Sequence, residues 1–229
     1  MMKAVLRFGQ QAFIQNLILF CLSIGFSFAL LVARSYYSGT TYFSFLVWNL
    51  FLAFIPFALS SFIKLKKNLP LPFFLVLAFI WLLFFPNAPY ILTDLFHLRT
   101  RPGSPLWFDL VVILSFAWNG LLLGFVSLAD MQKEVKERFG PLSSSLFAVL
   151  SLFLGSFGIY LGRFLRWNSW DLLTQPLKLL QDIWIRFANP LDHPGAWGVT
   201  LIFSIFLGLC YLMLTQLSYA TKDKSKGMG

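Results

Sequence analysis

Six stretches of apolar residues, each long enough to cross a lipid bilayer, are the feature that most limits how this chain can fold. A membrane-spanning helix needs about 20 mostly apolar residues, and the segments that meet this length are residues 12–33, 42–63, 72–92, 106–128, 144–164 and 198–219. Charged residues make up only 12% of the chain, whereas a soluble domain has about 25%. We therefore predict an all-α fold, a polytopic bundle of about six transmembrane helices. Residues 1–221 are expected to form one integral membrane domain, followed by a basic tail at residues 222–229.

The first apolar stretch and the two cysteines have simple interpretations. Lys3 and Arg7 precede the stretch as in a signal peptide, but the apolar run is long for that role and no small-residue cleavage site follows. We interpret it as an anchored first helix. Cys21 and Cys210 both lie within apolar runs and predict neither a disulfide nor a metal site.

The distribution of basic residues between the loops predicts the orientation of the bundle. With six spans, eleven Lys and Arg residues fall on the side that holds both termini and seven on the opposite side. Loops rich in Lys and Arg stay in the cytoplasm, so we expect both termini to be cytoplasmic. The formal charge of +9 then reflects topology and contact with anionic lipid. Membrane lipid, and not nucleic acid, is the expected partner, while the sequence assigns no cofactor and no oligomeric state.

The stretch FFPNAPYILTDLFHL, residues 84–98, ends the third span with residues that suit hydrocarbon poorly. Pro86 and Pro89 each remove a backbone donor, and the carbonyls that they free at membrane depth need other partners. If the helix kinks and continues, four polar side chains share one face, at i, i+3, i+7 and i+10: Asn87, Tyr90, Asp94 and His97. Such a stripe should face protein or water. The alternative is that the prolines simply end the helix and His97 is an ordinary interfacial side chain.

A second polar cluster, GIYLGRFLRWNSWDLL at residues 158–173, is brought to the same face by the topology. Arg163 and Arg166 form a fork-shaped donor set suited to phosphate or carboxylate; the alternative is that they snorkel to lipid headgroups. The tryptophans of this stretch suit an interfacial belt, and Asp171 suits the first turn of a new helix. The fourth span starts on this side with Asp109. The ionisable residues expected to converge are Asp94, His97, Asp109, Arg163, Arg166 and Asp171.

The long loop before the last span predicts an amphipathic helix. Apolar Leu177, Leu180, Trp184 and Phe187 recur at helical spacing, opposite a polar set of Lys178, Gln181, Asp182 and Arg186. Pro176 starts the pattern and the segment ANPLDHPG stops it. A helix lying in the external membrane interface fits this pattern and could roof a lateral cleft.

The motifs FPNAPYILTDLFHL and YLGRFLRWNSWD resemble those of an uncharacterised bacterial family of multi-pass membrane proteins, a domain of unknown function. The resemblance implies a protein of the bacterial cytoplasmic membrane with about six spans, and it names no substrate. The positions that it carries over are Asn87, Pro89, Tyr90, Thr93, Asp94, His97, Gly162, Arg163 and Asp171.

Three classes of function fit these observations. In the first, an enzyme acts on an anionic lipid or lipid-linked substrate: the two arginines hold the head, and His97 with Asp94 serves as acid/base or metal ligand. A metal would also need Asp109 or Asp171, because only two histidines are present. In the second, a transporter or channel uses the Pro-broken third helix. In the third, a non-enzymatic envelope scaffold uses the polar stripe to lock helices together. No G-x-S-x-G, H-E-x-x-H or P-loop motif occurs.

Overall fold

The computed structural model describes the backbone of residues 2–66, 69–101 and 103–227, and the side chains of residues 18–217 within those ranges. In this part of the chain every regular element is helical. Six segments are long and apolar enough to cross a membrane: Ile18–Ser38, Tyr42–Leu65, Leu71–His97, Leu106–Phe139, Pro141–Phe164 and Pro194–Leu217. The predicted all-α polytopic bundle is therefore confirmed. The basic tail predicted at residues 222–229 lies outside the described side chains.

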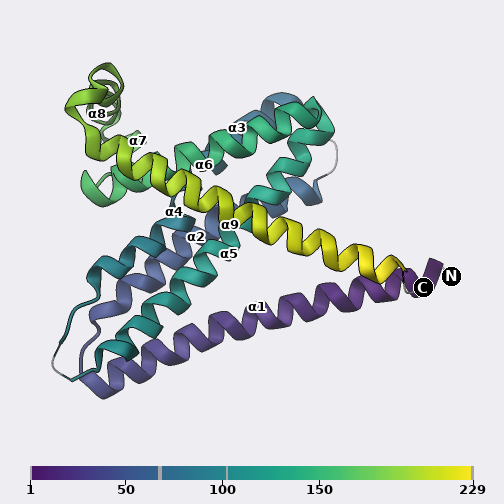
Figure 1. Cartoon of the computed structure of the whole chain (residues 1–229), viewed down its shortest axis with the longest axis horizontal. Coiled ribbons are helices and arrows are strands. Elements are labelled where there is room, and N and C mark those ends of the chain that lie inside the picture. The colour runs from purple at the N-terminus through teal and green to yellow at the C-terminus, as the bar shows by residue number, and fades with distance from the viewer. Residues whose placement is uncertain (1, 67–68, 102, 228–229) are drawn as a thin grey trace.

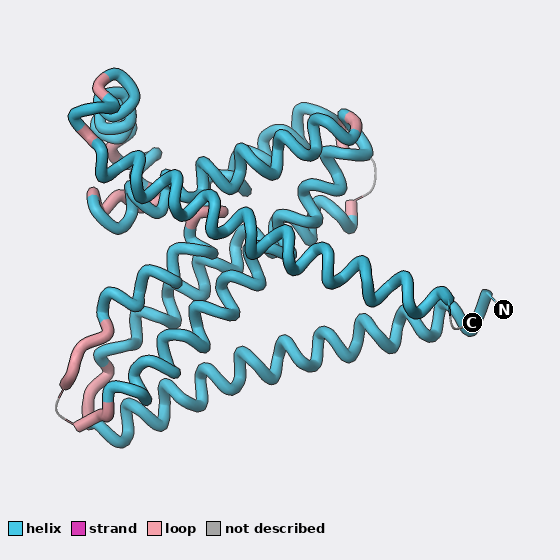
Figure 2. Tube along the Cα trace, in the orientation of Figure 1, coloured by secondary structure: helices cyan, strands magenta, loops and turns pink. Residues whose placement is uncertain are grey.

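The spans are built from helices α1 (Met2–Ser38), α2 (Phe45–Leu65), α3 (Leu71–Phe84), α5 (Leu106–Phe139), α6 (Pro141–Phe164) and α9 (Pro194–Gly227). The shorter elements are η1 (Tyr42–Ser44), α4 (Asn87–Tyr90), η2 (Ile91–His97), α7 (Asp171–Thr174), α8 (Pro176–Ala188) and η3 (Pro190–Asp192). Helix α5 is central: α1, α2 and α6 pack against it, and α9 packs against α6 (Figures 1 and 2). Because consecutive spans alternate in direction, η2, α7 and α8 share one side of the domain, called the α8 side below.

Helix α5 is longer than its apolar segment. The charged residues after Leu128 suggested a loop, but the helix continues to Phe139. Ion pairs one turn apart, Lys133 with Glu137 and Glu134 with Arg138, support this extension. The helix ends at Gly140, whose φ of 90° ordinary residues rarely adopt.

The third span is broken at Pro86, where α3 gives way to the short α4 and then to the 3-10 helix η2. Two glycines of neighbouring helices let this irregular segment pack closely. A Cβ atom at Gly158 of α6 would lie 2.6 Å from Pro86 Cγ, and one at Gly120 of α5 would lie 2.6 Å from Ile91 Cδ1. Small residues at such contacts are how helices approach each other within a membrane. The broken segment is therefore fixed between α5 and α6.

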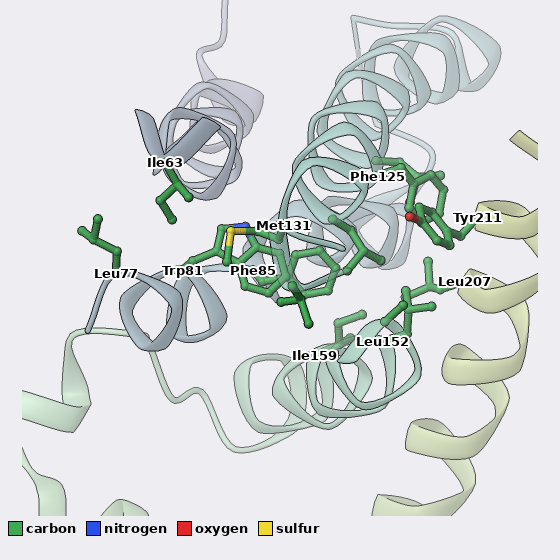
Figure 3. Close-up of a cluster of buried hydrophobic side chains, with 14 of the residues drawn as sticks. Ile63, Leu77, Trp81, Phe85, Phe125, Met131, Leu152, Ile159, Leu207 and Tyr211 are labelled. Carbon is green, nitrogen blue, oxygen red and sulfur yellow. The ribbon is translucent and has the colours of Figure 1, made fainter. Parts of the chain in front are cut away.

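Buried apolar side chains form two clusters, one toward each side of the domain. Trp81 and Phe85 of the third span belong to the first cluster, which also contains residues of α2, α5, α6 and α9 (Figure 3). The Trp81 indole also donates to Ser127 Oγ, which donates to the Pro56 carbonyl at 2.9 Å. The second cluster joins α1, α2 and α5 around Phe43 and Phe116. Hydrogen bonds such as those made by Trp81 and Ser127 hold helices together within a membrane, where burial of apolar side chains alone gives little driving force.

Helix α8 occupies the range that its amphipathic pattern predicts. Its apolar residues Leu177, Leu180, Trp184 and Phe187 are all exposed, as expected of a face in contact with lipid. The polar face differs from the prediction, because Arg186 is only 8% exposed. Its Nη1 donates to the Asp182 carbonyl and carboxylate, and its Nε donates to the Tyr160 hydroxyl. Arg186 therefore ties α8 to α6 instead of facing water.

Candidate functional site

An arginine near the end of α6 binds three side chains of η2. Arg163 donates through Nε to Thr93 Oγ1 at 2.8 Å and through Nη2 to Asp94 Oδ1 at 2.6 Å, and its Nη1 lies 3.1 Å from His97 Nε2. Asn49 of α2 donates to the other carboxylate oxygen, Asp94 Oδ2, at 2.7 Å. The side chain of Asp94 is 1% exposed and that of Arg163 12%. The expected pairing of Asp94 with Arg163 is thus a direct ion pair, and these five residues are called the Arg163 network below.

The contact with Arg163 indicates which ring nitrogen of His97 carries the proton. A guanidinium only donates hydrogen bonds, so His97 Nε2 must accept and the neutral ring carries its proton on Nδ1. The ring also packs against Phe45, with 5.0 Å between ring centroids. In this arrangement the basic lone pair of His97 is occupied, and Arg163 bridges His97 to Asp94. The two residues predicted as an acid–base pair are therefore partners of one guanidinium.

The 3-10 geometry of η2 explains why the predicted polar stripe is divided. In a 3-10 helix residues i and i+3 are eclipsed, so Asp94 and His97 lie above one another and both reach Arg163. An unbroken α-helix would have kept Asn87 and Tyr90 on the same face. Instead these two residues lie in α4, before the change of geometry, and line a cavity. The expectation of one continuous stripe is corrected in this respect.

The cavity lies beside the network and has a volume of about 400 Å³. Most of its wall is apolar, including Leu82 of α3, Leu154 and Leu161 of α6, and Leu179 and Ile183 of α8. The polar lining residues are Asn49, Asn87, Tyr90, Asn168 and Ser169. Because α8 contributes part of the wall, the predicted cleft beside this amphipathic helix is present.

Two residues connect the cavity to the Arg163 network. Asn49 lines the cavity and donates to Asp94. Tyr90 lines it as well, and the Arg163 guanidinium lies over the Tyr90 ring, with Cζ 4.5 Å from the ring centroid. The network therefore forms part of the support of the cavity wall.

Two backbone carbonyls just before the break at Pro86 accept hydrogen bonds from side chains that line the cavity. Asn87 Nδ2 donates to the Phe84 carbonyl at 2.9 Å and to Ser169 Oγ at 3.0 Å, and Ser169 donates to the Leu83 carbonyl at 3.0 Å. Asn87 directly follows the break, whereas Ser169 comes from the loop after α6. These bonds join the polar part of the cavity lining to α3 and to the loop after α6.

The other predicted site residues lie apart from the network. Arg166 is exposed, in a left-handed conformation with φ of 63°, so the predicted fork of Arg163 and Arg166 is not formed. Asp171 accepts from the Asn168 backbone N–H at 2.7 Å and from the Thr174 hydroxyl at 3.1 Å. It closes the turn that begins α7, which agrees with the alternative reading of this residue.

Asp109 belongs to a second buried ion pair. Arg34 of α1 donates through Nε to Asp109 Oδ1 at 3.1 Å, and both side chains are 1% exposed. Ser104 donates to the same oxygen at 2.7 Å, and Arg34 also donates to Thr40 Oγ1 at 2.6 Å. This pair joins α1 to α5, and its partners are separate from those of Asp94 and Arg163. Of the six ionisable residues expected to converge, only Asp94, His97 and Arg163 come together. Asp109 lies in a separate cluster, and Arg166 and Asp171 belong to neither.

Asn49 and Ser169 are the site residues that the sequence did not point to. Asn49 is the one strongly polar side chain within the apolar residues 42–59, and this isolation was an available signal. No sequence signal pointed to Ser169, because a serine in a polar loop is ordinary. Its role depends on the loop folding back onto α3.

A metal site is not assembled in the described part of the chain. No group of three or more His, Cys, Asp and Glu side chains comes together there. Asp94 and His97, the candidate ligands, both bind the Arg163 cation.

Comparison with known proteins gives the family. The model of the family described as protein of unknown function (DUF1361) matches residues 48–210, a range that contains Asn49, the broken third span, the end of α6 and α8. Searches of curated proteins and of solved structures find no match. More than two-thirds of the chain is matched, and the protein therefore belongs to the DUF1361 family of proteins of unknown function.

Proposed function

We propose that this protein binds a lipid or a lipid-linked molecule at the α8 side of the membrane, with the hydrocarbon chain in the cavity and the head beside the polar lining. The observation that carries the proposal is the cavity itself. It has the size of a small-molecule site, is mostly apolar, and includes amide and hydroxyl groups in its wall. We also propose, from the distribution of Lys and Arg, that the α8 side faces outward.

The position of the cavity favours a ligand that comes from the membrane. Its wall includes α8, whose exposed face carries Leu177, Leu180, Trp184 and Phe187, side chains suited to the interface. A hydrocarbon chain gains little free energy on leaving lipid for an apolar cavity, since lipid tails are as apolar as the wall. Selection among lipids must then come from the polar lining residues.

The Arg163 network serves this function best as a rigid support. Arg163 is neutralised by Asp94, and the His97 lone pair is already used, so neither is a free base or an open anion site. Binding is thus better supported than a reaction catalysed by His97. A transport path is less favoured, because the deeper Asn119 donates to Ser23 and Ser27 of α1 and does not line this cavity.

Native mass spectrometry of the purified full-length protein tests the proposal. Wild-type protein should retain a bound lipid after detergent exchange. Leu154→Trp places a large side chain in the cavity wall and should reduce retention at least fivefold. Leu150→Trp is the matched control, because Leu150 lies one turn away on α6, is 48% exposed and does not line the cavity. Equal retention by the two variants would refute a lipid site in the cavity.

A further inference from the structure

Three asparagines in the cavity lining have their orientation fixed by the protein. The side-chain amide of Asn49 donates to Asp94 Oδ2 at 2.7 Å, that of Asn87 to the Phe84 carbonyl at 2.9 Å, and that of Asn168 to Asp171 Oδ2 at 3.2 Å. Carbonyl and ionised carboxylate oxygens can only accept. Each amide must therefore present its nitrogen to the protein, and its carbonyl oxygen is left for other partners.

Acceptors and donors both remain in the cavity lining: the carbonyl oxygens of the three asparagines, and the second amide N–H of Asn49 and of Asn168. Among the described residues, none donates to Oδ1 of Asn49, Asn87 or Asn168, and the Tyr90 hydroxyl has no protein partner. These four groups are absent from the buried polar atoms that lack partners, so they are not sealed off. The lining residues include no charged side chain. A complementary head must bring hydrogen-bond donors for the amide oxygens and acceptors for the remaining N–H groups.

We propose that the ligand is a lipid whose head carries several hydroxyl groups, such as a sugar or another polyol. This rests on the proposed function and specifies its substrate class. Hydroxyl groups both donate to amide oxygens and accept from amide N–H groups, whereas an ionised phosphate only accepts and would leave the three amide oxygens without donors. An ammonium head would also donate, but the lining offers no carboxylate to neutralise it, and the Arg163 cation lies over Tyr90. Trp48 and Trp167 also line the cavity, and aromatic rings suit the flat apolar faces of a sugar ring.

The test compares lipids with identical acyl chains and different heads. Full-length protein in phosphatidylcholine nanodiscs is titrated with glucosyl diacylglycerol, phosphatidic acid or phosphatidylethanolamine, and retention is measured by native mass spectrometry. We expect the glucosyl lipid to bind at least tenfold more tightly than the other two. Free glucose at the same concentrations should not compete, because the proposed ligand is held in the membrane by its tail.

Tyr90→Phe gives the residue-level test, because it removes one hydroxyl that bonds no protein group. It should weaken the glucosyl lipid about three- to tenfold, as expected for one neutral hydrogen bond, and leave binding of phosphatidic acid unchanged. Tyr36→Phe, at an exposed tyrosine of α1 outside this cavity, is the control and should change neither.

The outcomes separate this inference from the proposed function. Retention of all three lipids with equal affinity, or a preference for phosphatidic acid or phosphatidylethanolamine, would overturn the hydroxylated head while leaving a lipid site in place. An unchanged affinity of Tyr90→Phe for the glucosyl lipid would overturn it too. Retention of no lipid, or full competition by free glucose, would overturn the lipid site and this inference with it.

Discussion

The ion pair between Asp94 and Arg163 should dominate the stability of the α8 side. Arg163→Gln leaves Asp94, which is 1% exposed, with Asn49 as its remaining side-chain partner. Removing one member of a buried pair costs about 3–5 kcal/mol, because the other charge stays uncompensated. Asp94→Asn costs a similar amount: its new amide nitrogen would face the Asn49 nitrogen, and Arg163 would keep an unmatched charge. The double substitution replaces both charges by amides that can bond each other. We therefore expect it to cost about 3 kcal/mol, similar to either single change, which gives a coupling energy of about 3 kcal/mol.

Unfolding of the four proteins in mixed micelles, followed by circular dichroism, measures this coupling. The control cycle combines Asp94→Asn with Arg34→Gln, since Arg34 belongs to the other buried pair and shares no partner with Asp94. Those two changes should add to within about 0.5 kcal/mol. Strict additivity of Asp94→Asn and Arg163→Gln would show that the two side chains do not share one environment, and the site as described would be wrong.

Three further changes test other parts of the structure. Gly158→Leu should destabilise the protein by about 1–3 kcal/mol or more, since even a Cβ would lie 2.6 Å from Pro86 Cγ, and a thermal melt unchanged from wild type would contradict that contact. His97→Ala removes a neutral acceptor and should cost only about 1 kcal/mol; a loss as large as that of Arg163→Gln would argue against the neutral ring. In a cysteine-free background, Thr100→Cys should react with an impermeant maleimide added to intact cells, while a reporter at the C-terminus should read as cytoplasmic; labelling only after lysis would reverse the topology.

The fold could be predicted from the sequence because its determinants are local. Each span is a mostly apolar run near the required length, and only α-helices satisfy every backbone group in lipid without partners from other segments. The error was at the end of α5, where charge was taken as the end of the helix. Lys133 and Glu134 are good helix formers, and their partners lie one turn ahead, so the helix extends beyond its apolar part.

The site could be predicted only in part, because its contacts join segments that lie far apart in sequence. Asp94, His97 and Arg163 were found since polar groups at the ends of apolar helices need partners, and few were available. The division of the stripe was missed because it depends on the 3-10 geometry of η2, a feature that a 3.6-residue periodicity cannot contain. Asp109 was grouped with Arg163 on the basis of side alone, which says nothing of lateral distance. Arg166 was paired with Arg163 because the two lie one helical turn apart, but α6 ends at Phe164, between them.

The two buried ion pairs each consist of an arginine and an aspartate, but they have different roles. Arg34 and Asp109 are bound by neighbouring hydroxyl groups and are 1% exposed, so that pair can only join α1 to α5. Asp94 and Arg163 contact side chains that line the cavity: Asn49 donates to Asp94, and Arg163 lies over the Tyr90 ring. A ligand that bonds Asn49 or displaces Tyr90 would therefore change the contacts of Asp94 and Arg163. The pair of Arg34 and Asp109 has no such connection to the cavity. If the cavity binds lipid as proposed, substitutions in the Arg163 network should alter lipid retention, and Arg34→Gln should affect stability alone.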